Sequence, residues 1–202
     1  MRPVYVGIIL NGGSITASTE PNADGKYLSG RPITIEADAA EEGMKFAYWI
    51  DENGDIKSYS SSYTFYLCDD KELTAVYVGE EEMVSQEVLV YVESFEGKDI
   101  YGTFIYSWSV PEAENSLTYQ ASGIVAVDKE YYQADMLYHG TTDSNVKDRS
   151  VSAPHNKATG SYSWTGYIDS GETWVAMAWV QYTDSDGNTY IEYSDLFEVT
   201  KA

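Results

Sequence analysis

The feature that most constrains this chain is a pair of aromatic-rich segments separated by a polar turn. Residues 43–49 read Gly-Met-Lys-Phe-Ala-Tyr-Trp, residues 73–78 read Leu-Thr-Ala-Val-Tyr-Val, and Asp-Glu-Asn-Gly-Asp at residues 51–55 supplies the turn. Aromatic and β-branched residues favour strands, and Asn-Gly is typical of a tight hairpin. No segment repeats its apolar residues convincingly with a helical period. The sequence therefore predicts a mainly β fold.

Length and composition predict two folded domains. The chain has 202 residues, which exceeds the roughly 100 to 150 residues of a common domain. Hydrophobic residues make up 43% of it, with 19 Tyr and 5 Trp, so there is enough apolar surface for packed cores. Disorder is therefore not expected.

The charge of the chain argues against two classes of partner. There are 33 Asp and Glu against 12 Lys and Arg, for a net charge of −21. Such a surface repels phosphate backbones and anionic lipid head groups, so we expect no nucleic acid and no membrane insertion. The lone Cys68 cannot form an intramolecular disulfide, which fits a cytosolic protein and equally a Gram-positive surface protein that avoids cysteine.

The two ends of the sequence suggest a piece of a longer protein. The segment after Met1 runs directly into strand-like residues 4–6 without the apolar stretch of a signal peptide. The sequence stops at residues 199–202, directly after a predicted strand, without a wall-sorting signal. We interpret Met1 as an added start.

The first 40 residues contain a predicted hairpin and an alternating strand. Residues 3–10 form a β-branched run, Asn-Gly-Gly at residues 11–13 predicts a tight turn, and residues 15–18 are expected to return as the partner strand. In residues 33–38, Ile, Ile and Ala alternate with Thr, Glu and Asp, which indicates a strand with one buried face. Residues 19–32 are predicted to be a loop, because Gly and Pro interrupt them.

The next strand carries two large rings at positions of opposite parity. Phe46 and Trp49 would point to opposite faces of a regular strand. Either a β-bulge turns one of them, or both faces of the sheet are covered. Residues 63–67 and 73–77 are predicted to complete the unit, with a turn at residues 69–71 between them.

These segments together resemble a known repeat family. The residues that carry the resemblance are Asn-Gly-Gly-Ser at 11–14, Phe46 and Trp49, Asn53-Gly54, Tyr63 and Phe65, and Leu-Thr-Ala-Val-Tyr at 73–77. In this order they resemble the divergent internalin-type B-repeats, over residues 4–78. The resemblance implies a small β-grasp-like repeat domain without catalysis, found in secreted and wall-attached proteins of Gram-positive bacteria. The matching residues are core and turn residues, and they carry no information about a ligand.

A charged run separates this unit from a second one. Gly-Glu-Glu-Glu at residues 79–82 is typical of an exposed boundary, so we predict domains at residues 1–79 and 87–202 with a linker at residues 80–86. The second domain has strand candidates at residues 87–95, 104–110, 117–127, 131–138, 160–168, 173–183 and 189–199. About seven strands in roughly 115 residues is the density of a Greek-key sandwich, and an immunoglobulin-like β-sandwich is predicted.

Two segments of the second domain resemble sandwich domains of bacterial surface proteins. Residues 106–112 look like the second strand of a fibronectin type III domain, in which a buried Trp, here Trp108, precedes a loop containing Pro. Residues 176–195 are similar to a closing hairpin. The loop at residues 139–160 is long and polar and holds both histidines, so it is one candidate for a recognition site.

Metal binding is the less favoured interpretation of the acidic and histidine residues. Residues 51–55 and 184–188 place oxygen side chains at alternate positions, as the first ligands of a calcium loop do. Both lack the glycine and the distal glutamate of such a loop, so hairpin turns are the preferred interpretation. His139, His155 and Cys68 lack the paired spacing of a zinc site. We predict no metal and no cofactor.

The sequence offers no catalytic motif but contains candidate binding residues. It has no Gly-x-Ser-x-Gly elbow and no phosphate-binding glycine loop, so the protein is predicted not to be an enzyme. Aromatic residues of the second domain offer an alternative, an exposed platform for sugar stacking, although most are expected in the core. These aromatics are Tyr131, Tyr132, Tyr138, Tyr162, Trp164 and Trp174. The candidate ligand-binding residues are Tyr138, His139, His155, Tyr162 and Trp164.

Taken together, the residues and the resemblances predict a monomeric, non-catalytic module that is extracellular or attached to the cell wall. Its expected role is adhesion to a host or neighbouring surface protein, or that of a spacer. The alternative is a carbohydrate-binding module of a secreted protein that acts on polysaccharides.

Overall fold

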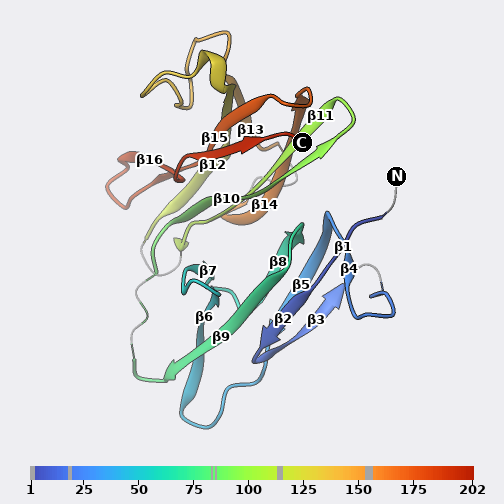
Figure 1. Cartoon of the computed structure of the whole chain (residues 1–202). Coiled ribbons are helices and arrows are strands. Elements are labelled where there is room, and N and C mark those ends of the chain that lie inside the picture. The colour runs from blue at the N-terminus through green and yellow to red at the C-terminus, as the bar shows by residue number, and fades with distance from the viewer. Residues whose placement is uncertain (1–2, 18–19, 83, 85, 113–115, 153–156) are drawn as a thin grey trace. The chain divides into compact units, whose positions relative to one another are not determined.

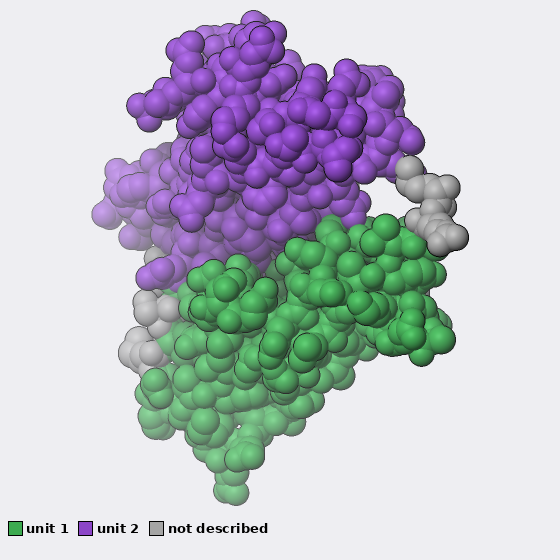
Figure 2. Space-filling view, in the orientation of Figure 1, with its two compact units in different colours: residues 1–86 green, residues 87–202 purple. Residues whose placement is uncertain are grey.

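The computed structural model describes residues 3–17, 20–82, 84, 86–112, 116–152 and 157–202. The elements bounded within these residues are seventeen strands and one 3-10 helix (Figure 1). The chain divides into two compact units, residues 1–86 and residues 87–202 (Figure 2). The predicted fold class, a mainly β protein with a small β-grasp-like domain and an immunoglobulin-like sandwich, is confirmed.

Unit 1 is built from two packed sheets and a short two-stranded ribbon. Its strands are β1 (Tyr5–Val6), β2 (Ile8–Asn11), β3 (Gly13–Ala17), β4 (Tyr27–Leu28), β5 (Arg31–Ala37), β6 (Met44–Asp51), β7 (Ile56–Ser58), β8 (Ser62–Leu67) and β9 (Lys71–Gly79). One sheet has the order β2-β9-β6-β7, another has β3-β5-β8, and β1 pairs with β4. The core contains the fully buried side chains of Ile35, Trp49 and Leu67.

The hairpin predicted at residues 11–13 is wrong. β2 pairs in parallel with β9, whereas β3 pairs with β5, so the chain changes sheets at Gly12 instead of folding back on itself. Gly12 has a φ of +80°, which a side chain would disfavour. At Gly13 an added Cβ would lie 2.5 Å from the carbonyl oxygen of Glu36 and 2.7 Å from the ring of Trp49. Glycine therefore lets the backbone cross directly over the core tryptophan.

A β-bulge explains the two rings of opposite parity in β6. Phe46 lies opposite Tyr77 and Tyr48 lies opposite Val76, so Ala47 is an extra residue on one side of the ladder. The ring centroids of Phe46 and Trp49 lie 5.7 Å apart. Of the two alternatives that the sequence left open, the bulge is the one observed. The predicted turn at residues 69–71 is observed as a connection at residues 68–70, because Lys71 already begins β9, and it joins strands of different sheets.

Unit 2 is an immunoglobulin-like sandwich of a three-stranded and a five-stranded sheet. Its elements are β10 (Leu89–Lys98), β11 (Tyr101–Ser109), β12 (Thr118–Asp128), the 3-10 helix η1 (Lys129–Tyr131), β13 (Lys147–Ser150), β14 (Thr159–Tyr167), β15 (Thr173–Thr183), β16 (Thr189–Tyr193) and β17 (Phe197–Thr200). The first sheet has the order β10-β11-β14, and the second has β13-β12-β15-β16 with β17 also paired to β15. The first, second and fifth strands of the unit thus share one sheet, as in immunoglobulin-like folds.

The strands of unit 2 largely follow the sequence pattern, with three differences. Residues 131–138 were predicted as a strand, but η1 ends at Tyr131 and no strand follows before β13. β13 itself lies inside the predicted loop at residues 139–160. The last predicted strand is two strands, because Ser194 accepts the backbone N–H of Ala178 through its hydroxyl and turns the chain between β16 and β17.

Tryptophan fixes the centre of the inter-sheet core of unit 2. Trp108 is buried on β11, as its likeness to a fibronectin type III strand implied, and its indole N–H donates to the carbonyl oxygen of Lys157 at 2.7 Å. On β12 and β15, every second residue points into the core between the two sheets, as Ile124 and Ala178 do. The residues between them, such as Val125 and Trp179, point to the opposite face of the sheet and belong to a second hydrophobic cluster. The five-stranded sheet therefore buries both of its faces.

Candidate functional site

The predicted site residue His139 holds the segment after η1 against the five-stranded sheet. Its imidazole stacks on the indole of Trp179, with ring centroids 3.7 Å apart and planes 21° apart. Its Nδ1 lies 2.9 Å from Oδ2 of Asp148, and its backbone N–H donates to the hydroxyl of Tyr193 at 2.9 Å. Residues of β13, β15 and β16 thus hold His139 in place. The imidazole is thus a structural contact of the loop.

The loop around His139 forms part of a second hydrophobic cluster. Leu137 and Val146 are buried there against Val127 and Val175 of the sheet. Because loops that bind ligands are usually exposed and mobile, a loop that packs a core has fewer groups left for recognition. His139 and Val146 of the predicted recognition loop therefore pack against the outer face of the five-stranded sheet, while residues 142–145 between them are exposed.

The other predicted site residues do not join His139. Tyr162 and Trp164 lie on β14 and pack on the core between the two sheets, where Trp164 stacks on Phe104 with ring centroids 5.9 Å apart. Both side chains are partly buried, because their parity on β14 places them on the inner face, as was expected for most of these aromatics. Tyr138 is exposed next to His139, and His155 lies outside the described residues.

The two acidic loops are hairpin turns with the same hydrogen-bond pattern. In the first, Oδ1 of Asp51 accepts the backbone N–H groups of Asn53 and Asp55 at 2.9 and 3.0 Å. In the second, Oδ1 of Asp184 accepts those of Asp186 and Asn188 at 2.9 Å each. Glycine follows in both, with φ near +85°: 87° at Gly54 and 82° at Gly187. The turn interpretation is confirmed.

Hydrogen bonds within these turns stabilise the ionised carboxylates. Burial would raise the pKa of Asp51, but the ammonium group of Lys57 and the N–H groups of the turn outweigh it and hold that pKa below its ordinary value. Hydrogen bonds from the side chain and backbone of Asn188 lower the pKa of Asp184. Within the described part of the chain, no group of three or more His, Cys, Asp and Glu side chains is placed to hold a metal ion.

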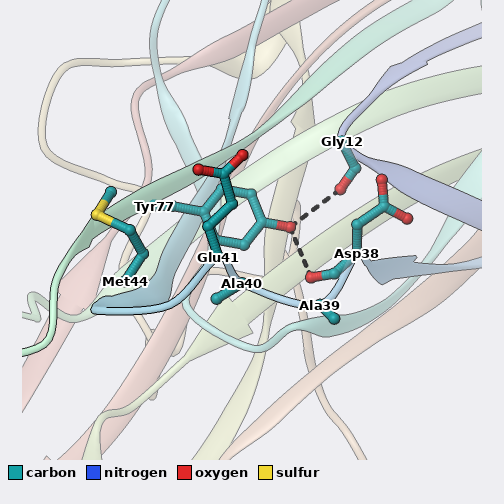
Figure 3. A pocket seen from close by; sticks show the side chains of 7 residues that line it. All are labelled: Gly12, Asp38, Ala39, Ala40, Glu41, Met44 and Tyr77. Carbon is teal, nitrogen blue, oxygen red and sulfur yellow. Dashed lines mark hydrogen bonds between the residues drawn. The ribbon is translucent and has the colours of Figure 1, made fainter.

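Unit 1 contains a pocket of about 330 Å³ beside Tyr77 (Figure 3). The phenol of Tyr77 donates to the carbonyl oxygens of Asp38 and Gly12 at 2.8 and 3.2 Å, which fixes its ring in the pocket. Burial raises the pKa of this phenol, so it remains protonated at neutral pH. Glu41 and Met44 complete the wall. The lining suits a small neutral or basic group and offers no nucleophile paired with a base.

A larger hollow of about 510 Å³ in unit 1 carries charges of both signs. Lys26 lies 3.6 Å from Asp70, and Lys71 lies 3.5 Å from Asp69. Asp70 also accepts the backbone N–H of Gly7 at 2.6 Å, and this bond, followed by the charge of Lys26, lowers its pKa. The bond to Gly7 ties the residue before β9 to the start of the chain.

The most exposed aromatic group in unit 2 is one that the sequence reasoning did not single out. Tyr101 at the start of β11 lies directly opposite Tyr167 at the end of β14. Their ring centroids are 4.9 Å apart with planes at 37°, and the hydroxyl of Tyr101 donates to that of Tyr167 at 3.5 Å. The side chains are 41% and 72% exposed. The signal in the sequence was Tyr-Gly at 101–102 facing Gly-Tyr at 166–167. These two residues are called the tyrosine pair below.

The comparisons with known proteins identify the first unit only. Residues 10–81 match the family described as "Divergent InlB B-repeat domain", close to the span of residues 4–78 expected from the resemblance. This family covers less than half of the chain. No curated protein matches the chain.

The solved structures to which this chain is similar are distant from it. A DUF3823 family protein from Bacteroides uniformis ATCC 8492 has 9% identity and a TM-score of 0.40, and the alignment covers 98% of each chain. A DUF3823 family protein from Bacteroides ovatus ATCC 8483 has 10% identity and a TM-score of 0.36, covering 98% of this chain and 100% of the other. The D312A variant of BcpA, the major pilin subunit of Bacillus cereus, has 12% identity and a TM-score of 0.34, covering 100% of this chain and 70% of the pilin chain. TM-scores below 0.5 carry no functional inference.

Among the described residues there is no helix of the length and hydropathy needed to cross a membrane.

Proposed function

We propose that this chain is a non-catalytic module of an extracellular or wall-attached bacterial protein, where it acts in adhesion or as a spacer. The observation that carries the proposal is the match of residues 10–81 to the B-repeat family, joined in one chain to an immunoglobulin-like sandwich. The proposed source is a Gram-positive bacterium, on the strength of the same resemblance.

The placement of the polar side chains supports a non-catalytic role. Asp51 and Asp184 bind the backbone of their own turns, and His139 is held by Trp179 and Asp148. A general base or nucleophile needs a free face toward a substrate. These groups instead serve the local structure.

The charge of the chain limits the partners that an adhesive module accepts. A net charge of −21 keeps copies of a module apart, which supports a monomer, and it favours a neutral or basic partner surface. A spacer benefits from the same repulsion, because charged modules remain soluble at high local concentration.

A binding assay with the whole chain distinguishes a role in adhesion from a role as a spacer. Immobilised host extracellular-matrix proteins and a glycan array are probed with purified protein at physiological ionic strength, with bovine serum albumin as the control surface. Saturable binding supports adhesion, and the absence of binding on both supports a spacer. Release of sugar or peptide products from any of these surfaces would contradict the non-catalytic proposal.

A further inference from the structure

The tyrosine pair lies on the outer face of the three-stranded sheet. Phe104 and Trp108 of β11 point into the core, so Tyr101, at a position of the other parity, points away from it. Tyr167 lies on β14, an edge strand, which explains its 72% exposure. Isolated exposed aromatics are ordinary, but two rings in direct cross-strand contact form one continuous apolar surface.

The backbone beneath the tyrosine pair is held in place by a buried lysine. Lys201 is only 4% exposed, and its ammonium group donates to the carbonyl oxygen of Asp99 at 2.6 Å and to that of Ile168. The backbone N–H of Ile168 also donates to the carbonyl oxygen of Ile100 at 3.1 Å. These bonds join the turn before Tyr101 to the residue after Tyr167. The two rings are therefore presented by a fixed scaffold, and little conformational entropy is lost when a ligand binds them.

Glycine residues give the scaffold a tight inner side. Gly102 and Gly166 face each other one position along from the tyrosines, on the core side of the sheet. An added Cβ at Gly102 would lie 2.6 Å from the ring of Phe95, and one at Gly166 would lie 2.8 Å from the ring of Trp164. Core rings thus fill the space under both glycines, next to the tyrosines in the sequence.

The neighbours of the tyrosine pair are polar. The next outward pair along the strands is Thr103 and Thr165, whose hydroxyl oxygens lie 2.9 Å apart. Lys98 lies opposite Tyr101 on the other side, on β10. Residues directly opposite in an antiparallel pair have side chains on the same face. Glu96 of β10 lies opposite Thr103 in the same way. The face therefore combines two aromatic rings with hydroxyl groups, an ammonium group and a carboxylate.

This combination fits a sugar better than it fits a protein. Sugar rings have one face of C–H groups, which stacks on an aromatic ring, and a rim of hydroxyls, which hydrogen-bond to groups such as those of threonine and lysine. A stable protein interface buries at least about 1,000 Å² around a central apolar cluster, more than two tyrosines bordered by threonines supply. The net charge of −21 disfavours anionic polysaccharides.

We propose that the tyrosine pair stacks on the sugar rings of a neutral polysaccharide, with Thr103, Thr165 and Lys98 bonding to its hydroxyl groups. The inference deepens the proposed function and rests on it, because it gives the non-catalytic surface module a class of ligand.

Native affinity electrophoresis of the whole chain tests this proposal. The gels contain mixed-linkage β-glucan, xyloglucan, galactomannan or arabinoxylan, and a polygalacturonate gel serves as the anionic comparison. The variants are Tyr167→Ala, Tyr101→Ala and Tyr167→Phe, and the control is Tyr131→Ala, which removes a tyrosine that is 50% exposed at η1. Thermal melting checks that each variant is folded.

We expect retardation by at least one neutral polysaccharide and none by polygalacturonate. Tyr167→Ala and Tyr101→Ala are each expected to weaken the apparent affinity by about tenfold, equal to about 1.4 kcal/mol. Tyr167→Phe keeps the ring and should bind within about threefold of the parent, because stacking supplies most of the contact. Tyr131→Ala should bind like the parent.

The proposal is overturned if none of the four neutral gels retards the parent, or if both alanine variants bind like it. Binding of a matrix protein that needs Tyr167, without polysaccharide binding, also overturns it and leaves the adhesive function standing. Release of reducing sugar from a polysaccharide would instead contradict the non-catalytic function itself, so the two failures are distinguishable.

Discussion

The two units of this protein bury their sheets in different ways. In unit 1, β5 and β8 alternate, so that Ile33 and Phe65 are buried while Glu36 and Thr64 are exposed. In unit 2, every residue from Ser122 to Val127 of β12 is buried, because the sandwich core covers one face and the segment after η1 covers the other. A sheet with one covered face leaves an exposed side, whereas a sheet covered twice uses its loops for packing.

This comparison changes where recognition is to be sought. The long segment before β13 looks like a recognition loop in the sequence, yet it supplies Leu137 and Val146 to a hydrophobic cluster. The three-stranded sheet of unit 2 carries the tyrosine pair on its outer face. The tyrosine pair is therefore the recognition site that we propose in place of the loop.

The largest expected effect comes from removing one central tryptophan from each unit. Trp49→Ala in unit 1 and Trp179→Ala in unit 2 each delete a fully buried ring, and each should lower the free energy of unfolding by about 3 to 5 kcal/mol. Because the units have separate cores, differential scanning calorimetry of the whole chain should show each variant shifting a different transition. A single transition shifted equally by both variants would show that the units fold as one, and would contradict the predicted division at residues 80–86.

A glycine substitution tests the double cover of the five-stranded sheet. In Gly123→Ala the new methyl group would lie 2.6 Å from the ring of Trp179 and would also meet the carbonyl oxygen of Arg149. We expect a loss of about 1 to 3 kcal/mol of stability, measured by urea unfolding. The control is Gly79→Ala at the end of β9, where nothing lies within 4 Å of an added Cβ. Equal midpoints for the two variants would mean that the outer face of β12 is open.

A smaller effect is expected from loosening the segment between η1 and β13, which covers one face of the five-stranded sheet. His139→Ala removes the stacking on Trp179 and the contact with Asp148, and should cost about 1 kcal/mol. Limited proteolysis should then cut the segment between η1 and β13 faster than in the parent. Tyr138→Ala, next in sequence and exposed, is the matched control. If the histidine variant were cleaved at the same rate as the parent, His139 would not be what holds this segment against the sheet.

The acidic turns should make the stability of each unit depend on pH. The pKa values of Asp51 and Asp184 are lower in the folded chain than the ordinary value of about 4, so their stabilisation is complete above about pH 4 and is lost as the pH falls through the folded pKa values. Asp51→Ala should cost unit 1 about 1 kcal/mol at pH 7, and less below pH 3. Melting curves at both pH values check this, and a loss that stays constant with pH would contradict it.

The smallest expected effect is that of calcium. Because Oδ1 of each turn aspartate already accepts two backbone N–H groups, millimolar calcium should change the melting temperatures no more than magnesium does. A calcium-specific rise of several degrees, abolished by Asp184→Ala or Asp55→Ala, would show that one of these turns is a metal site.

Much of the strand pattern could be read from local sequence. Ile33 and Ile35 alternate with polar residues, which marks β5 because side chains alternate across a sheet. In β15 the apolar run at residues 174–180 is uninterrupted, as in a strand buried on both faces. The turn chemistry at Asp51 and Asp184 was equally local, since the side chain bonds the backbone two and four residues on.

Contacts between residues that are distant in the sequence could not be predicted from such local patterns. Asn-Gly-Gly at residues 11–13 suits a hairpin, and only the parallel pairing of β2 with β9 makes it a crossing between sheets. His139 and Trp179 lie 40 positions apart, and nothing in their spacing indicates that their rings stack.

The sequence by itself thus determined the mainly β class, the elements with a clear period and the acidic turns, because these depend on the conformational preferences of neighbouring residues. Only the tertiary structure decided that Tyr162 and Trp164 pack against the core while Tyr101 and Tyr167 lie on the surface. The physical reason is that a strand pattern defines two faces, but which face meets the core depends on the sheet that packs against it.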